Sequence, residues 1–278
     1  MSESPGLPAY FQRIAYRGSG APSLETLEDL HALHAAAIPF ENLSPLLGEP
    51  VKLDLASLEA KLVRGGRGGW CFEHNLLFSH VLVALGFNVT RLAARVRWNA
   101  SPGTVGARSH MLLLVKLEGG NYIADVGFGG LTLTAPLELR AGLEQSTPHE
   151  PHRLVAEGAG YVLEAKIAGE WQALYAFELH EQKIADYEVS NWYLCHHPGS
   201  LFLAGVIAAR AAPEARHALR NTLYSIHYPD GTTERRHIAS VDEFFATLAG
   251  PFAIRLPDAP KLRDKLEALI ETHSLSKE

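Results

Sequence analysis

Apolar residues recur at helical spacing through residues 1–88 of the chain. Ser23 is a residue type that often caps helices, and Asp54 stands at the start of a second such segment. After these two residues the leucines fall on one helical face in each segment: Leu24, Leu27, Leu30 and Leu33, then Leu55, Leu58 and Leu62. A third helix is predicted from Cys71 to a position just before Gly86, a residue type that often follows a helix. We therefore predict a helical bundle over residues 1–88.

Near residue 90 the apolar positions begin to alternate with polar ones, which is typical of a half-buried β-strand. Residues 111–117 and 121–126 flank Glu118-Gly119-Gly120 and predict a hairpin. Three further strand patterns are separated by turns that contain glycine: residues 153–156, 161–167 and 171–177. We therefore predict that residues 89–190 form an antiparallel sheet or a small β-barrel.

Residues 191–278 mix both periods. A hairpin is predicted around Pro229-Asp230-Gly231, because these residue types favour a tight turn. Ser240 and Glu243 have the spacing of a capping box, and the leucines from Leu262 onward mark a final amphipathic helix. The sequence therefore predicts an α+β protein in three parts: residues 1–88, 89–190 and 191–278.

Composition and charge describe an ordinary globular protein. Hydrophobic residues make up 47% and charged residues 20% of the 278 residues, which allows a full core. The net charge of -6 argues against nucleic-acid binding. The longest largely apolar run, residues 76–87, is too short to span a bilayer. We therefore expect neither nucleic acid nor a membrane as a partner.

The cysteine content indicates a reducing compartment. The chain has two cysteines without a CxxC pair, so a disulfide framework is excluded. Residues 1–17 lack the basic stretch and the apolar core of a signal peptide. We therefore expect a cytoplasmic protein, in which a reactive thiol stays usable.

Cys71 combines two features of a reactive thiol. It follows the glycine-rich residues 65–69 closely and directly precedes an apolar helical pattern. Unpaired N–H groups and the macrodipole at a helix N-terminus favour an anion, and such positions lower the pKa of a thiol in general. Glycines also let backbone or substrate approach the sulfur. Taken alone, a cysteine here also fits a buried structural role, but its neighbours favour a nucleophile.

A nucleophilic thiol needs a base and a group that orients this base. Of the 14 histidines, His110 stands out because it starts an apolar strand pattern, and Asp125 ends the partner strand of the same hairpin. Antiparallel pairing would bring His110 and Asp125 to the same end of the sheet. We therefore predict a triad of Cys71, His110 and Asp125, in which the carboxylate stabilises a thiolate–imidazolium pair.

Other interpretations of these residues stay open at this point. His110 alone fits a structural histidine, and Asp125 alone fits a turn residue. His74 shares a helix face with Cys71, but no acidic residue is evidently placed to orient it. A metal site built from these four side chains lacks the usual paired ligand spacing, so we expect no metal.

Five motifs together resemble the arylamine N-acetyltransferase family, and the resemblance covers nearly the whole chain. They are Arg67-Gly68-Gly69-Trp70-Cys71-Phe72-Glu73-His74-Asn75, Ile38-Pro39-Phe40-Glu41-Asn42-Leu43, Ala94-Arg95-Val96, Ser109-His110-Met111 and Asp125-Val126-Gly127-Phe128-Gly129. The resemblance implies the same triad, Cys71, His110 and Asp125. It also implies an N-terminal helical bundle, a central antiparallel β-barrel and a C-terminal α/β lid around a cysteine-protease-like catalytic core. Trp70 and His74 occupy places where the family varies, which bears on fine substrate preference.

The resemblance further implies a two-step acetyl transfer without a bound cofactor. Acetyl-CoA, the co-substrate, would acetylate Cys71, and an arylamine, arylhydrazine or N-hydroxyarylamine would then take the acetyl group. Backbone N–H groups at the start of the Cys71 helix fit the role of oxyanion donors. Arg67, Glu41 and Asn42 match the family's buried polar network and are expected to brace the loop that carries the cysteine.

Several residues match the family's substrate-binding positions. Aromatic walls suit a flat aryl ring, and glycines after Asp125 allow backbone N–H groups to approach coenzyme A. Taken singly, each phenylalanine also fits an ordinary core position. The predicted substrate-binding residues are Phe40, Val96, Ser109, Gly127, Phe128, Gly129 and Phe202.

The predicted triad is compatible with other functions. In a cysteine peptidase or an acyl-CoA thioesterase, water replaces the amine while the nucleophile and the base stay the same. An amide synthase that closes a ring on a carrier-bound chain is a related alternative. A thiol-bearing scaffold without catalysis would require the complete triad to be incidental.

Overall fold

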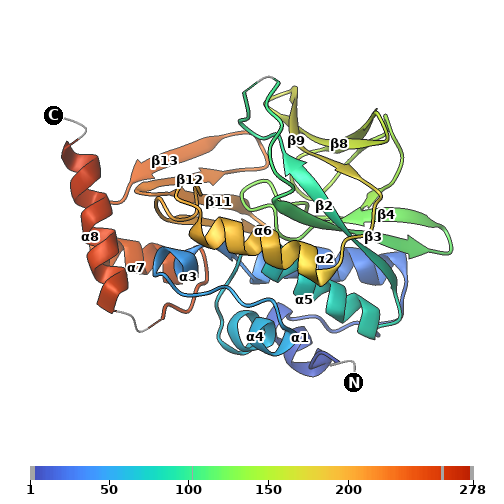
Figure 1. Ribbon diagram of the computed structural model, residues 1–278, viewed down its shortest axis with the longest axis horizontal. Helices are drawn as coiled ribbons and strands as arrows, with labels where there is room; N and C mark the ends of the chain where they lie inside the picture. Colours follow the sequence, from blue (N-terminus) through green and yellow to red (C-terminus); the bar gives the residue numbers. More distant parts are fainter. Residues whose placement is uncertain (1–3, 102, 258–259, 276–278) are drawn as a thin grey trace.

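The computed structural model describes residues 4–101, 103–257 and 260–275. Helices of the N-terminal part lie along the bottom of the view in Figure 1, and an eight-stranded sheet lies at the upper right. A second sheet and the last two helices lie at the left, and α6 (Ile184–His196) crosses the front between the two sheets. None of the described helices is long and apolar enough to cross a membrane.

The N-terminal part is helical, as predicted. α2 (Leu24–Ala37) begins after Ser23, whose hydroxyl accepts a hydrogen bond from the Thr26 N–H. α5 (Cys71–Ala84) ends close to Gly86, which has a φ of 90° that suits glycine. Most residues of α5 are buried, and this helix lies in the largest core cluster. The remaining elements are α1 (Leu7–Ile14), β1 (Phe40–Glu41), α3 (Leu43–Leu46), α4 (Leu55–Leu58) and the π-helix η1 (Glu59–Arg64).

The middle of the chain forms a nearly closed antiparallel barrel. Its strand order is β5-β4-β3-β2-β9-β8-β7-β6, and leucines and aromatic residues fill its interior. The edge strands approach each other where the Gln145 side-chain amide bonds to the backbone N–H and carbonyl of Glu138, at 2.8 and 3.0 Å. The strands are β2 (Asn88–Val96), β3 (His110–Leu117), β4 (Gly120–Ala124), β5 (Leu137–Glu138), β6 (Glu144–Gln145), β7 (His152–Glu157), β8 (Gly160–Ile167) and β9 (Glu170–Glu178).

The C-terminal part contains a second antiparallel sheet, which the N-terminal part completes. Strand β1 pairs with β10 at one edge of this sheet, and Phe40 is the register partner of Ala209. The last two helices share a core cluster with the sheet. The elements are β10 (Ile207–Ala212), β11 (Ala215–Arg220), β12 (Leu223–His227), β13 (Thr233–His237), α7 (Val241–Ala249) and α8 (Pro260–Leu275).

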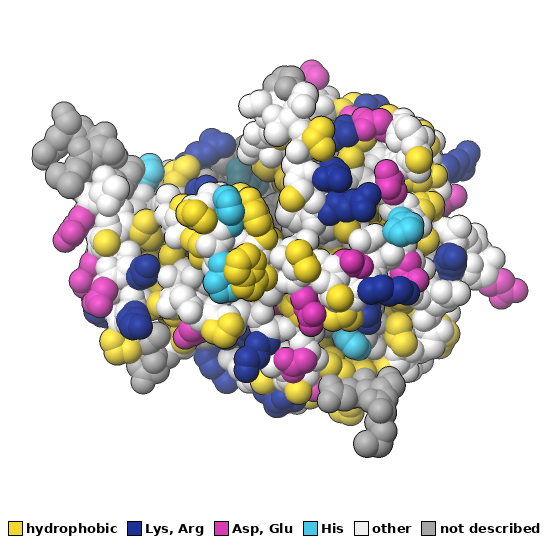
Figure 2. Space-filling view, viewed as in Figure 1, with side chains coloured by type: hydrophobic (Ala, Val, Ile, Leu, Met, Phe, Trp, Pro, Cys, Tyr) yellow, Lys and Arg dark blue, Asp and Glu magenta, His cyan; other side chains and the backbone are white. Residues whose placement is uncertain are grey.

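Helix α6 has no counterpart in the sequence prediction, and it spans the boundary predicted at residue 190. Its apolar residues do not form a buried stripe, because Val189, Trp192 and Tyr193 are 72%, 64% and 43% exposed. Figure 2 shows hydrophobic and histidine side chains gathered where α6 lies on this face. The helical period was therefore masked by apolar residues on the exposed side of α6. Helix α1 and strands β10 and β11 were also not predicted.

Candidate active site

Cys71 is the first residue of α5 and is 5% exposed. The Trp70 N–H donates to Glu73 Oε2 at 3.1 Å, and the first helical hydrogen bond runs from the His74 N–H to the Trp70 carbonyl. Within the described ranges, the N–H groups of Cys71 and Phe72 have no hydrogen-bond partner. Free N–H groups at a helix start stabilise a nearby negative charge.

Backbone encloses the cysteine on two sides. Its Sγ lies 3.6 Å from the carbonyl oxygen of Ser109. Gly127 lies so close that a Cβ at this position would be 2.9 Å from the Cys71 Cα, nearer than real Cβ atoms come. Glycine is therefore required at residue 127 by close approach to the thiol-bearing residue.

His110 and Asp125 come from the two strands of one hairpin. His110 begins β3, and Asp125 directly follows β4. His110 Nε2 is 2.6 Å from Asp125 Oδ2, and the Cys71 side chain interacts with the same imidazole. Burial opposes protonation of this ring, but the carboxylate and the thiol together raise the pKa of His110 to about 10. The surroundings thus stabilise an imidazolium beside a sulfur.

The Asp125 carboxylate is fully buried and accepts two hydrogen bonds at each oxygen. Oδ1 accepts from Asn75 Nδ2 and from the Gly127 N–H, both at 2.9 Å. Oδ2 accepts from His110 and, at 2.9 Å, from the Tyr175 hydroxyl. Burial raises the pKa of this carboxyl, but His110 and the other donors outweigh burial and hold it below the usual range. The carboxylate is therefore charged and fixed in orientation.

Asn75 and Tyr175 were missed in the sequence analysis. Asn75 Nδ2 also donates to the Met111 carbonyl at 2.8 Å, and its Oδ1 accepts from the Val126 N–H at 3.2 Å. It therefore joins α5 to both strands of the hairpin. Its position four residues after Cys71, on the same helix face, was an available signal. Tyr175 lies in β9, where the sequence pattern indicates only a strand position.

His74 belongs to a different buried network. Its Nε2 is 3.1 Å from the carbonyl oxygens of Pro39 and Gly69, and its Nδ1 is 3.0 Å from His34 Nε2. Nε2 therefore carries the proton, and Nδ1 accepts the proton of His34. Burial lowers the pKa of His74 to about 4, although the two carbonyls act in the opposite direction. The ring is neutral, and both of its nitrogens are engaged.

Arg67, Glu41 and Asn42 divide between two networks. Arg67 Nε donates to Glu41 Oε1 at 2.7 Å, and Glu41 is 1% exposed. This pair lies next to the loop that leads to Cys71. Asn42 instead binds three backbone groups near Phe202: the carbonyl oxygens of Phe202 and Gly205, at 2.8 and 2.7 Å, and the Ile207 N–H, at 2.7 Å.

One group of the predicted substrate-binding residues lies at the barrel side of the triad. The Phe128 ring stands edge-on to His110 with the centroids 5.0 Å apart. Val96 is the register partner of Tyr175, whose hydroxyl binds Asp125. Ser109 and Gly127, described above, contact Cys71 through their backbones.

A second group consists of Phe40, Phe202 and Gly129. The rings of Phe40 and Phe202 are 6.1 Å apart, and Phe202 lies 5.1 Å from Trp70 in a T-shaped contact. Gly129 has a φ of 84°, and a Cβ on it would lie 3.6 Å from the Phe40 ring. Because Gly129 follows Phe128 directly, the two groups meet at this loop.

Comparison with known proteins places this site in a family. The N-acetyltransferase family model matches residues 23–261. An arylamine N-acetyltransferase of Mycobacterium tuberculosis strain H37Rv is 43% identical over 269 residues, which cover 95% of this chain and 94% of that protein. The chain belongs to the arylamine N-acetyltransferase family.

Two further arylamine N-acetyltransferases support this assignment. The structure of the Mycobacterium marinum arylamine N-acetyltransferase in complex with CoA matches with a TM-score of 0.90 at 42% identity, over 96% of this chain and 98% of that chain. The arylamine N-acetyltransferase / N-hydroxyarylamine O-acetyltransferase of Salmonella typhimurium is 39% identical over 91% of this chain and 90% of that protein. The chain is thus an acyltransferase with the α+β fold that the resemblance implied.

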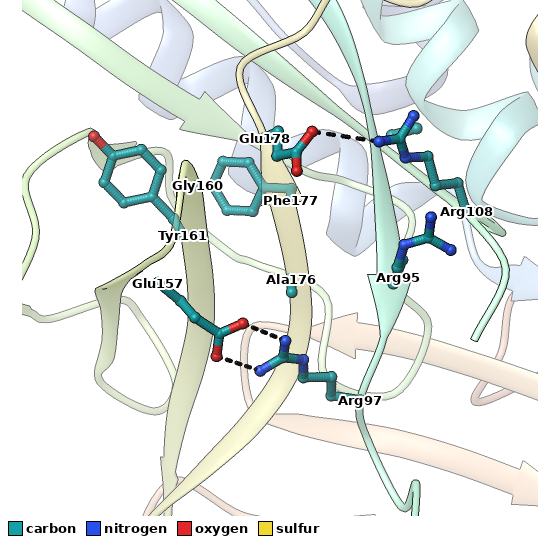
Figure 3. Close-up of a pocket in the computed structure, with 10 residues that line it drawn as sticks. Arg95, Arg97, Arg108, Glu157, Gly160, Tyr161, Ala176, Phe177 and Glu178 are labelled. Atoms are coloured by element: carbon teal, nitrogen blue, oxygen red, sulfur yellow. Dashed lines mark hydrogen bonds and ion pairs between the residues drawn. The ribbon is translucent and has the colours of Figure 1, made fainter. Parts of the chain in front are cut away.

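The acetyltransferase also has a pocket away from the triad, on the barrel strands. Figure 3 shows Arg97 facing Glu157 and Arg108 facing Glu178, with Arg95 between the two other arginines. Arg97 binds Glu157 through two hydrogen bonds of 2.7 and 2.5 Å, and Arg108 binds Glu178 at 3.3 Å. Two of the three cations are therefore paired, and no triad residue lines this pocket. We assign it no step of acetyl transfer.

Proposed function

We propose that the protein transfers acetyl groups from acetyl-CoA to aromatic amines through a thioester on Cys71. In this proposal Cys71 is the nucleophile, His110 is the base and acid, and Asp125 orients His110 and stabilises its charge. The single observation that carries it is the contact of the buried His110–Asp125 pair with a thiol at an unpaired helix N-terminus.

In the first step the Cys71 thiolate attacks the carbonyl carbon of acetyl-CoA. The carbonyl oxygen becomes negative, and the free N–H groups of Cys71 and Phe72 are suited to stabilise it. The carbon–sulfur bond to coenzyme A then breaks, and the leaving sulfur takes the proton held by His110. The products are CoA and acetylated Cys71, with His110 now neutral.

In the second step the nitrogen of an amine attacks the thioester on Cys71. His110 takes a proton from this nitrogen, and the Cys71 sulfur leaves as a thiolate. The Asp125 carboxylate stabilises the imidazolium that forms. CoA leaves before the amine reacts, so initial-rate kinetics should be ping-pong with parallel double-reciprocal lines.

The acceptor is proposed to be an arylamine, an arylhydrazine or an N-hydroxyarylamine. The aromatic rings of Phe40, Phe128 and Phe202 offer flat apolar surfaces for an aryl group. An arylamine is largely neutral at pH 7, whereas an alkylamine is mostly charged and must lose hydration to reach an apolar site. The name of the Salmonella relative, which includes N-hydroxyarylamines, also supports this acceptor class.

Acetyl-CoA is proposed as the acetyl donor because the related M. marinum structure contains CoA. Gly127 and Gly129 have no side chain to keep the pantetheine arm from the backbone, and we propose that with Ser109 and Val96 they line its approach. The Arg67–Glu41 pair and Asn42 are proposed as supports of the site. A reducing, cytoplasmic setting is proposed because the acetyl-carrying thiol must stay reduced.

Intact-protein mass spectrometry tests this function and separates it from its alternatives. Acetyl-CoA alone should add one acetyl group, and aniline should then remove it with formation of acetanilide. The Cys71→Ala variant should stay unmodified. Cys195→Ala should behave as the wild type, because burial raises the pKa of the Cys195 thiol and keeps it protonated.

Other results in the same experiment would reject the proposal. Rapid loss of the acetyl group in water without an amine would indicate a thioesterase. Transfer only to the amine of a carrier-bound chain would indicate an amide synthase. Acetylation of Cys71→Ala would show that Cys71 is not the acetyl carrier.

A further inference from the structure

Glu73 places a carboxylate at the start of the helix that carries Cys71. Glu73 is 2% exposed, and its Oε2 accepts the Trp70 N–H at 3.1 Å. A Cβ on Gly69 would lie 2.5 Å from this oxygen, so the carboxylate occupies the space beside the loop. A negative charge stabilises a helix start, but it opposes a second negative charge two residues away. A negative charge on Glu73 therefore stabilises the start of α5 and at the same time disfavours the thiolate of Cys71.

Lys61 supplies the neutralising charge. Its Nζ lies 2.7 Å from Glu73 Oε1, and its side chain is only 18% exposed. Lys61 lies in η1, and π-helical turns occur often at functional sites. Carbonyls of η1 also hold the loop that follows: the Gly65 N–H donates to Ala60 at 2.8 Å, and the Arg67 N–H donates to Lys61 at 3.1 Å.

No other group around Glu73 replaces this lysine. Glu41 is a second carboxylate, and it is itself paired with Arg67 at 2.7 Å. His74, the residue after Glu73, is neutral because burial lowers its pKa to about 4. Among the residues that the structure describes, Lys61 is the only cation within ion-pair distance of Glu73.

The groups around Cys71 do not balance the carboxylate either. The charge of His110 is engaged with Asp125 at 2.6 Å. From α6, Tyr187 and Cys195 act on Cys71 and Glu73 respectively, and burial raises the pKa of both side chains so that they stay uncharged. The balance of charge at the start of α5 therefore depends on Lys61.

We propose that Lys61 is a positioning residue for acetyl transfer that neutralises Glu73, so that this carboxylate caps α5 without suppressing the Cys71 thiolate. Lys61 acts through Glu73, with which it forms its ion pair. The inference rests on the proposed role of Cys71 as the nucleophile. In this proposal the Lys61–Glu73 pair, which lies outside the triad, influences the fraction of Cys71 that is present as thiolate.

The test follows the rate of iodoacetamide alkylation of Cys71 against pH. Lys61→Met keeps the length of the side chain but removes the cation that opposes the rise of the Glu73 pKa caused by burial. Once Glu73 ionises in this variant its carboxylate is unpaired, so the alkylation profile should move to higher pH. At pH 7 we expect alkylation about three- to tenfold slower, as a single uncompensated charge near the helix start predicts. Glu73→Gln keeps an oxygen acceptor for Trp70 and should move the profile to lower pH.

The double variant Lys61→Met with Glu73→Gln decides between charge and structure. With both charges removed, residues 61 and 73 together carry no net charge, as in the wild type. The alkylation profile of the double variant should therefore return to that of the wild type. Lys61→Arg should also match the wild type because it keeps the cation. Lys116→Met is a matched control, because Lys116 is exposed in β3 and makes no ion pair with any described residue.

The outcomes separate this inference from the proposed function. The role of Lys61 would be overturned if the alkylation profile of Lys61→Met equals that of the wild type. It would also be overturned if the double variant shows the same shift as Lys61→Met. A Glu73→Gln shift in the same direction as Lys61→Met would overturn it as well. Acetylation that persists in Cys71→Ala would instead reject Cys71 as the nucleophile, whatever the profiles of the Lys61 variants.

Discussion

Two buried histidines lie near Cys71: His110 interacts with it in the fold, and His74 follows it by three residues in the sequence. Their partners make one ring charged and the other neutral. His110 faces the Asp125 carboxylate at 2.6 Å, and its pKa is raised to about 10 in spite of burial. His74 faces two carbonyl oxygens and the ring of His34, and burial lowers its pKa to about 4. An imidazolium that stabilises a thiolate is therefore available only from His110.

Removing each histidine should separate these roles. His110→Ala removes the counter-ion of the sulfur, so alkylation by iodoacetamide at pH 7 should fall to that of an ordinary thiol, of which about a few per cent is ionised. His74→Gln should lower the melting temperature but leave the alkylation profile in place. If the profile shifts in His74→Gln and stays unchanged in His110→Ala, the assignment of the base is wrong.

At the scale of elements, Asn42 connects the start of the chain to the loop after α6. Its amide holds the carbonyls of Phe202 and Gly205, while the Phe202 ring contacts Phe40 and Trp70. These hydrogen bonds link residues more than 150 positions apart in the sequence. One aromatic wall of the proposed acceptor site is thus fixed by a side chain outside it.

Asn42→Asp should loosen this wall selectively. The substitution replaces the donor NH2 with an oxygen that faces two carbonyl oxygens, while the acceptor for Ile207 remains. We expect the KM for arylamines to rise about thirtyfold, since the two buried hydrogen bonds that are lost, of about 1 kcal/mol each, contribute about 2 kcal/mol together. Single-turnover acetylation of Cys71 by acetyl-CoA should change less than about threefold.

Steady-state and single-turnover rates measured on the same preparation check this prediction. Asn121→Asp is a suitable control because Asn121 is exposed in β4. If the rate of Cys71 acetylation and the rate of transfer to the amine fall together in Asn42→Asp, Asn42 supports the whole catalytic site and not only the aromatic wall.

The elements that could be predicted from the sequence are those whose periodicity reflects burial. Helix α5 and the β3–β4 hairpin have clear patterns, and these patterns sufficed to bring His110 and Asp125 to one end of the sheet. Helix α6 was missed because its apolar residues face both the core and the surface. Tyr175 was missed because its contact with Asp125 depends on pairing between strands far apart in the sequence. Long-range pairing leaves no periodic trace.

At the scale of the whole molecule, four described histidines that are at most 1% exposed are neutral at pH 7, and for one of them, His34, burial lowers the pKa well below its usual value. Burial lowers the pKa of His31, His74 and His152 to about 4 in each case. The unfolded chain has histidine pKa values of about 6.5, so it binds these protons first as the pH falls. Their contribution to stability is full above about pH 6.5 and is lost as the pH falls toward 4. The raised pKa of His110 cannot offset this, because its stabilisation is already complete below pH 6.5.

The free energy of unfolding should therefore fall steeply between pH 7 and pH 5. Each of His31, His74 and His152 should lower the free energy of unfolding by about 2 kcal/mol at pH 5. The sum of these losses is a large part of the stability of a typical domain. Denaturant unfolding followed by circular dichroism at the two pH values measures the loss.

His152→Leu provides a matched variant for this measurement. Neither ring nitrogen of His152 has a hydrogen-bond partner among the described residues, and Nε2 lies 3.7 Å from Glu150 Oε1. An apolar side chain therefore removes only this longer contact with a carboxylate. The variant should lose about 2 kcal/mol less than the wild type between pH 7 and pH 5. An equal loss in both proteins would show that His152 does not contribute to acid sensitivity.

The pairing of β1 with β10 has a consequence for synthesis on the ribosome. Phe40 finds its register partner in Ala209, and Asn42 finds its partners in residues 202–207. The nucleophile, base and carboxylate all leave the ribosome well before these residues do. Cys71 and the His110–Asp125 pair can therefore come together on a nascent chain while Phe202, the part of the aromatic wall that Asn42 holds, is still untranslated. The last part of the site to form is the part proposed to select the amine.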